Sequence, residues 1–172
     1  MRFLKLALVS LLILFLLTTA IGLLFPPAAK VTRVKDVAAS YDTVYHYLND
    51  VKYWKLWIYG ADSNIITFLS AKTAGTGTVA KIGTGEVTLT RATADSIYMM
   101  WKSQKGNVQN SVFVLRNNTA QNNVTVQWFF EQKINWYPWE RFGAMANDKI
   151  LGPVMEQSLD KLKKVLEKSK NP

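Results

Sequence analysis

An uninterrupted apolar run near the amino terminus is the feature that most constrains this chain of 172 residues. Residues 6–25 contain no charged side chain, and 14 of these 20 residues are Leu, Val, Ile or Phe. Twenty helical residues span about 30 Å, which is the thickness of the hydrocarbon core of a bilayer. The large apolar side chains would favour insertion by about 4 to 8 kcal/mol. Because Pro26 and Pro27 follow the run, we expect a transmembrane helix that ends there.

The basic head at residues 1–5 favours interpreting this helix as a signal-anchor that is retained. A cleaved secretory signal is the alternative, but the apolar stretch of such a signal usually has about 7 to 15 residues. Basic residues also follow the run, so charge balance alone does not fix the side of the membrane. We expect a single-pass membrane protein with a linker at residues 26–30 and its folded domain on the exported side.

Composition excludes several classes of function. The chain has no Cys and one His, which rules out disulfide scaffolds, zinc ribbons and thiol catalysis and leaves no expected metal site. The formal net charge is +9, but no basic stretch is interleaved with aromatic residues, so we expect no nucleic-acid partner. Gly75 and Gly77 match the sequence motif of a dinucleotide-binding turn, but the residues that follow are typical of a strand, where that turn requires a helix. No cofactor is therefore expected.

The remainder of the chain predicts an α+β domain at residues 31–170. Ser40 is a good cap for a short helix at residues 41–48. Apolar residues at a 3.6-residue period predict a final helix at residues 147–168, about 33 Å long. Short runs of β-branched and aromatic residues, separated by Gly and Asn, predict seven strands at residues 31–37, 64–70, 78–82, 86–92, 97–103, 111–116 and 124–134.

The order of these elements resembles the START-like, or SRPBCC, superfamily, which includes polyketide cyclase/dehydrase-like and lipid-transfer domains. The resemblance covers about residues 31–167. It rests on residues 39–51 followed by Trp54 and Trp57, on the hairpin of residues 113–128, and on the closing run at residues 148–153. None of these patterns is catalytic. The resemblance implies a helix-grip fold, in which a curved antiparallel sheet of about seven strands wraps around the long C-terminal helix and an apolar cavity between them holds a hydrophobic ligand.

Strand alternation predicts which side chains would line such a cavity, because every second residue of a strand points to the same face. The same spacing is also compatible with a core that is simply filled. The predicted lining consists of Val87, Leu89, Met99, Trp101, Phe113, Leu115, Val126, Trp128, Phe130, Met155 and Leu159. In the resembled fold the connection between the last strand and the final helix lies near one end of the cavity, so Trp136 and Trp139 are expected to form its entrance.

The sequence shows no catalytic set. No acidic side chain is expected to point into the cavity, and His46, one turn after Asp42, is interpreted as a surface residue. The favoured function is therefore a membrane-anchored binding module, rather than an enzyme, that holds a lipid or another hydrophobic small molecule. Two alternatives stay open. One is a cyclase/dehydrase-type enzyme acting on a hydrophobic substrate, with Tyr98, Ser103 or His46 moving protons; the other is an envelope interaction domain with a filled core.

Overall fold

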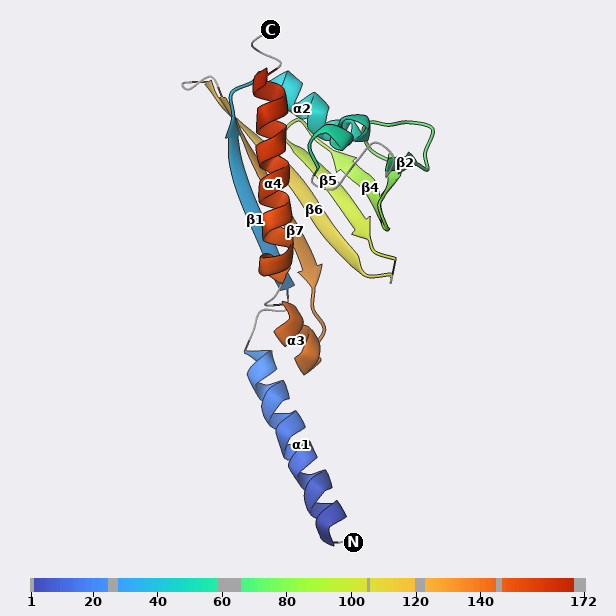
Figure 1. Ribbon diagram of the computed structural model, residues 1–172, viewed down its shortest axis with the longest axis vertical. Coiled ribbons are helices and arrows are strands. Elements are labelled where there is room, and N and C mark those ends of the chain that lie inside the picture. Colours follow the sequence, from blue (N-terminus) through green and yellow to red (C-terminus); the bar gives the residue numbers. More distant parts are fainter. Residues whose placement is uncertain are drawn as a thin grey trace.

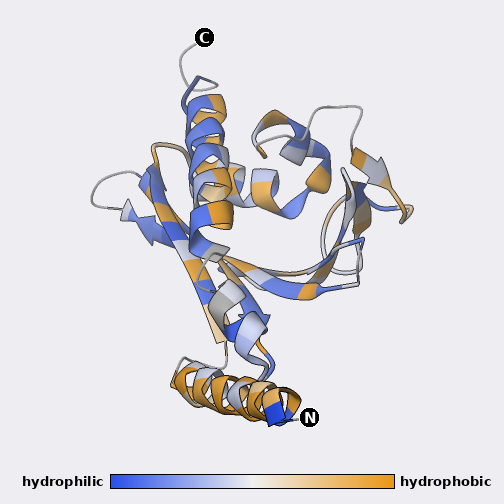
Figure 2. Ribbon diagram, turned by 60° about the horizontal axis from the view of Figure 1, so that its bottom comes forward, coloured by the Kyte–Doolittle hydropathy of each residue, from blue (hydrophilic) through white to orange (hydrophobic). Residues whose placement is uncertain are grey.

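The computed structural model describes residues 2–24, 28–58, 66–104, 106–119, 123–144 and 147–168. Helix α1 (Arg2–Leu23) extends from one end of the folded domain (Figure 1) and is hydrophobic on nearly all sides (Figure 2). Within the described residues it is the one helix long and apolar enough to cross a membrane. Thr18 and Thr19 donate their hydroxyl hydrogens to carbonyl oxygens one turn back, so their polarity is satisfied within the helix.

The domain contains one antiparallel sheet, as predicted. Its strands, in the described parts of the chain, are β1 (Ala28–Val37), β2 (Ile66–Phe68), β3 (Val79–Ile82), β4 (Gly85–Ala92), β5 (Ser96–Lys102), β6 (Val108–Asn118) and β7 (Asn123–Lys133). Their order across the sheet is β1-β7-β6-β5-β4-β3-β2. The first strand therefore pairs with the last, in a register that runs from Ala28 opposite Lys133 to Val37 opposite Val124.

Helix α4 (Asn147–Lys168) has the predicted bounds and lies against β1 and the concave face of the sheet (Figure 1). Its apolar stripe buries Met155, Leu159, Leu162 and Leu166 against that face. Beside α4, on the same side of the sheet, lie α2 (Tyr41–Asn49) and the 3₁₀ helix η1 (Val51–Leu56). This arrangement is the helix-grip fold: a curved sheet on one side and α4 with the small helices on the other.

Two short helices were not anticipated. The side chain of Asp50 accepts a hydrogen bond from Lys52 N and begins η1. Residues 136–139 were expected to be a plain connection, but Pro138 begins helix α3 (Pro138–Ala144), where its missing N–H costs nothing and its fixed φ suits the first turn. Helix α3 contacts the carboxyl end of α1.

Strand boundaries differ from the predicted ones mainly by one to three residues. Strand β1 begins at Ala28, so part of the expected linker already belongs to the sheet, and residues 26–27 lie outside the described part of the chain. Residues 64–65 of the second expected strand, and residues 169–170 at the expected end of the domain, also lie outside it.

Candidate functional site

The structure brings the predicted lining residues together on the concave face. All of them belong to or pack against one hydrophobic cluster; Trp101 is half-buried and the others are buried. Alternation brings them together, because the inward positions of β4 to β7 share the concave face, which α4, α2 and η1 cover. Contact between these side chains and a ligand stays a prediction.

Aromatic rings occupy the centre of this face. Trp54 and Trp57, both fully buried, reach into it from η1 and the residue after it. The Phe113 ring lies 5.0 Å from that of Trp128 and 5.8 Å from that of Trp57, centroid to centroid. Trp54 stacks on Trp101 with centroids 6.0 Å apart. These are the separations at which aromatic pairs attract one another. The centre of the face is therefore packed with rings.

The indole N–H groups of this cluster fall into two classes. Trp54 Nε1 donates to Leu48 O at 2.9 Å, and Trp128 Nε1 donates to Ser111 Oγ at 2.8 Å. Nε1 of Trp57 and Nε1 of Trp101 are buried and have no hydrogen-bond partner within the described structure. A buried donor without a partner costs about 1 to 3 kcal/mol. The concave face thus carries two donors that an acceptor oxygen would satisfy.

At the end of the concave face nearest α1 the lining becomes polar. Gln109 and Gln132 continue the inward alternation of Phe113 and Phe130, and Gln109 Nε2 donates to Gln132 Oε1 at 2.9 Å across the β6–β7 pair. A hollow of about 380 Å³ opens here. It is lined by Gly85, Trp101, Lys102, Ser103, Asn107, Gln109 and Gln132. We call this hollow the mouth of the concave face.

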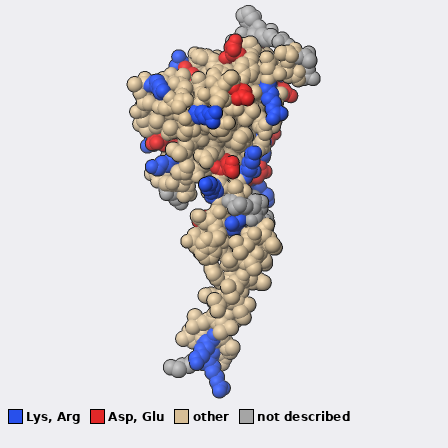
Figure 3. All heavy atoms as spheres, turned by 180° about the vertical axis from the view of Figure 1, so that it is seen from behind, with Lys and Arg blue, Asp and Glu red and all other residues tan. Residues whose placement is uncertain are grey.

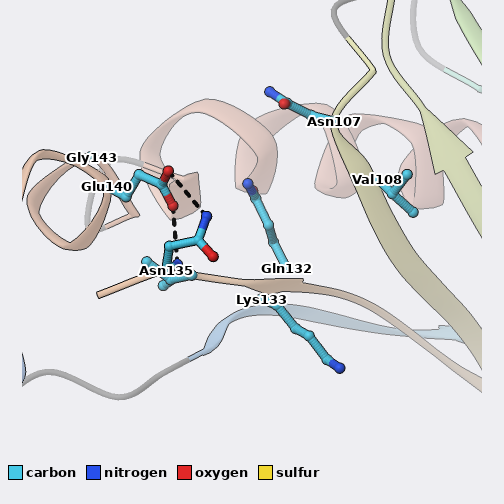
Figure 4. Close-up of a pocket in the computed structure, with 8 residues that line it drawn as sticks. Asn107, Val108, Gln132, Lys133, Asn135, Glu140 and Gly143 are labelled. Carbon is cyan, nitrogen blue, oxygen red and sulfur yellow. Dashed lines mark hydrogen bonds between the residues drawn. The ribbon is translucent and has the colours of Figure 1, made fainter. Parts of the chain in front are cut away.

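A second hollow, of about 310 Å³, shares Asn107 and Gln132 with the mouth and extends it to α3. Its far wall is a hydrogen-bonded pair (Figure 4): Glu140 accepts from Asn135 N at 3.0 Å and from Asn135 Nδ2 at 3.2 Å. Arg141 Nε donates to Asn135 O at 2.9 Å. The wall is therefore held in place from β7 to α3 by side-chain hydrogen bonds.

The two expected entrance residues lie outside these hollows. Trp136 is 51% and Trp139 62% exposed, and both rings pack on Tyr137, with centroids 4.6 and 4.9 Å apart. Asn135 and Glu140 of the same segment line the second hollow. The segment thus borders the second hollow, while its tryptophans line neither of the two hollows.

The amides of Gln109 and Gln132 and the rings of Trp54 and Trp57 were not predicted to belong to the site. His46 is exposed and contacts the rings of Tyr47 and Tyr53. Within the described residues, no group of three or more His, Cys, Asp or Glu side chains is arranged to hold a metal ion. The chemistry that this arrangement offers is apolar contact together with hydrogen bonding to a ligand.

No family model matches the sequence, and no curated protein matches it significantly. Solved structures share its fold. DynU16, described as a putative protein in the dynemicin biosynthetic locus, superposes with a TM-score of 0.60 at 13% identity over 81% of this chain, which spans 47% of that protein. CalU16 from Micromonospora echinospora gives 0.56 at 13% identity, covering 79% of this chain and 73% of that one. SA2116 from Staphylococcus aureus, a protein of unknown function, gives 0.66 at 12% identity, covering 84% and 97%. These likenesses show the fold alone, which is the predicted helix-grip fold.

Proposed function

We propose that this protein is a membrane-anchored binding module, not an enzyme. It holds a lipid or another hydrophobic small molecule between the sheet and α4. The ligand enters at the mouth of the concave face. The observation that carries the proposal is the buried indole N–H of Trp101, a residue that lines this mouth; the N–H has no hydrogen-bond partner among the described residues. A ligand with a carbonyl, ester or hydroxyl oxygen would accept from it and remove a penalty of about 1 to 3 kcal/mol.

The size and lining of the mouth support this class of ligand. Small-molecule sites usually measure about 300 to 1,000 Å³ and combine apolar walls with a few placed polar groups. The mouth, at about 380 Å³, is lined by Trp101 and by the amide-bearing residues Gln109 and Gln132, among others. An amphipathic molecule would place its polar end within hydrogen-bonding reach of the Trp101 N–H and the two amides, and its apolar part against the ring of Trp101.

Helix α1 supports the membrane anchor. Its large apolar side chains are exposed along its length, as the side chains of a lipid-facing helix are. An anchored domain stays within reach of the bilayer, which is a source of hydrophobic molecules. As in the sequence analysis, we place the domain on the exported side of the membrane.

Retention of lipid by the full chain tests the proposal. The protein in detergent micelles would be incubated with a total lipid extract, purified again and analysed by native mass spectrometry. We expect retained lipid species in the wild type that are lost in Trp101→Phe and kept in the control Trp136→Phe. Lipid bound only around α1 would be retained equally by all three proteins. Equal retention by wild type and Trp101→Phe, or no retention at all, would overturn the proposed site.

A further inference from the structure

Gly22 forms a joint between α1 and the folded domain. Among the described residues of α1, Gly22 alone is buried. A Cβ atom built on it would lie 3.7 Å from Cβ and Cγ of Arg141 and 3.7 Å from Cα of Pro138. The two helices therefore meet at van der Waals distance, with α3 lying directly on the backbone of α1. A longer side chain at position 22 would push them apart.

A continuous series of contacts connects Gly22 through α3 to the end of β7. Arg141 is 8% exposed, and its Nε donates to Asn135 O at 2.9 Å. Glu140 accepts two hydrogen bonds from Asn135, which follows the end of β7 by two residues. The same Asn135–Glu140 pair forms the wall of the second hollow. The position of α1 is thus linked to the wall of the second hollow, which adjoins the mouth at Asn107 and Gln132.

Helix α3 and the residues before it also expose an aromatic surface, which consists of Trp136, Tyr137 and Trp139. Both tryptophans are more than half exposed although their rings pack on Tyr137. Trp and Tyr favour the headgroup region of a bilayer, because their rings are apolar and can hydrogen-bond at one end. Helix α3 lies at the end of the molecule from which α1 extends (Figure 1).

The charge distribution agrees with a lipid partner at this end. On the face that Figure 3 shows, charged side chains of both signs are spread over the domain, and α1 carries charge only at its amino-terminal end. Gly22 is near the carboxyl end of the apolar run, so contact with Pro138 and Arg141 brings α3 to the level where that run would leave the hydrocarbon core.

We infer that the surface formed by Trp136, Tyr137 and Trp139 inserts into the headgroup layer of the bilayer, and that the Gly22 joint holds the domain so that its mouth borders this layer. The inference rests on the membrane anchor of the proposed function, but not on ligand binding. Its partner is the lipid interface that surrounds the end of α1.

The chain has no Cys, so a single introduced cysteine can carry a nitroxide label without background. The full chain would be reconstituted in liposomes with the label at Trp139→Cys or, as a reference, at Thr119→Cys. Thr119 is exposed and follows the end of β6 that lies away from α1. We expect relaxation of the Trp139→Cys label by oxygen, which partitions into lipid, to exceed relaxation by a water-soluble nickel chelate several-fold. The Thr119→Cys label should show the reverse. Equal accessibility of both labels to the nickel chelate would overturn the inference.

The joint is tested by Gly22→Leu in the chain labelled at position 139. The matched control is Ala20→Leu, which adds a similar bulk at an exposed position of α1. We expect Gly22→Leu to raise nickel accessibility of the label, and Ala20→Leu to leave it unchanged, while both variants keep the wild-type melting temperature of the domain. If the nickel accessibility of the position 139 label is unchanged in Gly22→Leu, the contact at Gly22 does not orient the domain. Absence of retained lipid in the wild type, with the position 139 label still at the depth expected, would overturn only the proposed binding site.

Discussion

The Trp128 indole donates a hydrogen bond to Ser111 Oγ at 2.8 Å, linking β7 to β6 in a part of the core where both side chains are buried. Ser111→Ala removes the acceptor with almost no change of volume and leaves a buried donor unpaired. We expect the free energy of unfolding to fall by about 1 to 3 kcal/mol. Denaturant titration measures this loss. Thr119→Ala, which removes a hydroxyl at an exposed position, is the control and should change stability by less than about 0.5 kcal/mol. Equal stability of the two variants would contradict the role assigned to the hydrogen bond.

Paired and unpaired indoles should respond differently to the same substitution. Trp54→Phe leaves the buried carbonyl of Leu48 without its donor, so unfolding should become easier by about 1 to 3 kcal/mol beyond the loss of ring area. Trp101→Phe removes a donor that has no partner within the described structure, and its stability loss should be smaller. Thermal and denaturant unfolding of both variants, under one buffer condition, provides the comparison. A larger loss for Trp101→Phe would show that its N–H is satisfied in solution.

Two tyrosines of α2 should make the domain sensitive to alkali. Tyr41 donates its hydroxyl hydrogen to Ala94 O at 2.5 Å, and Tyr45 donates to Thr93 O at 2.9 Å. Burial raises the pKa of both phenols above the ordinary value, and the charge of Asp95 adds to this effect for Tyr41. Because the folded state favours the protonated phenols, their contribution is fully present below about pH 10 and is lost as the pH rises through the folded-state pKa values.

Stability measured at increasing pH checks this expectation. The wild-type domain should lose stability above about pH 10, and the double variant Tyr41→Phe with Tyr45→Phe should show a shallower decline. Lys35, whose pKa is raised chiefly by its hydrogen bond to Asp160, contributes in the same direction and is unchanged in the variant. Identical slopes for the two proteins would contradict the assignment of the alkaline transition to the tyrosines.

Helix α1 should keep the protein in the membrane fraction through carbonate extraction, because about 30 Å of apolar helix favours the hydrocarbon core. A chain that starts at Ala28, where β1 begins, should instead stay in the supernatant. Amino-terminal sequencing of the protein from membranes decides between an anchor and a signal. A mature chain that begins near Ile21 would contradict retention.

Much of the fold could be predicted because its longest elements have strong periodic patterns. Helix α4 has an apolar stripe over its whole length, and its predicted bounds are correct. Helix α3 was missed because its 7 residues contain no such stripe. Its position depends on contacts with Gly22 and Asn135, which are distant in sequence or outside the helix. Local sequence carries no signal for contacts of that kind.

The predicted lining follows each strand only as far as large apolar residues continue along it. The predicted lining ends at Trp101 and Phe130, although two further residues of β7 lead to Gln132 on the same face. Following the alternation to the strand ends would have found both amides. The sequence could not show which indole N–H groups have a hydrogen-bond partner. For Trp128 this depends on the β6–β7 pairing, which brings Ser111 within hydrogen-bonding distance.

The pairing of β1 with β7 also determines how the domain would carry a mechanical load. Helix α1 and the carboxyl end of α4 lie at opposite poles of the molecule, and β1 runs from one pole toward the other (Figure 1). A pull between these poles would act along β1 and nearly perpendicular to the hydrogen bonds that join it to β7. All pairs from Ala28 opposite Lys133 to Val37 opposite Val124 would then bear the force together in shear, instead of opening one after another. The strand that follows the membrane helix is therefore attached in the geometry that best resists tension.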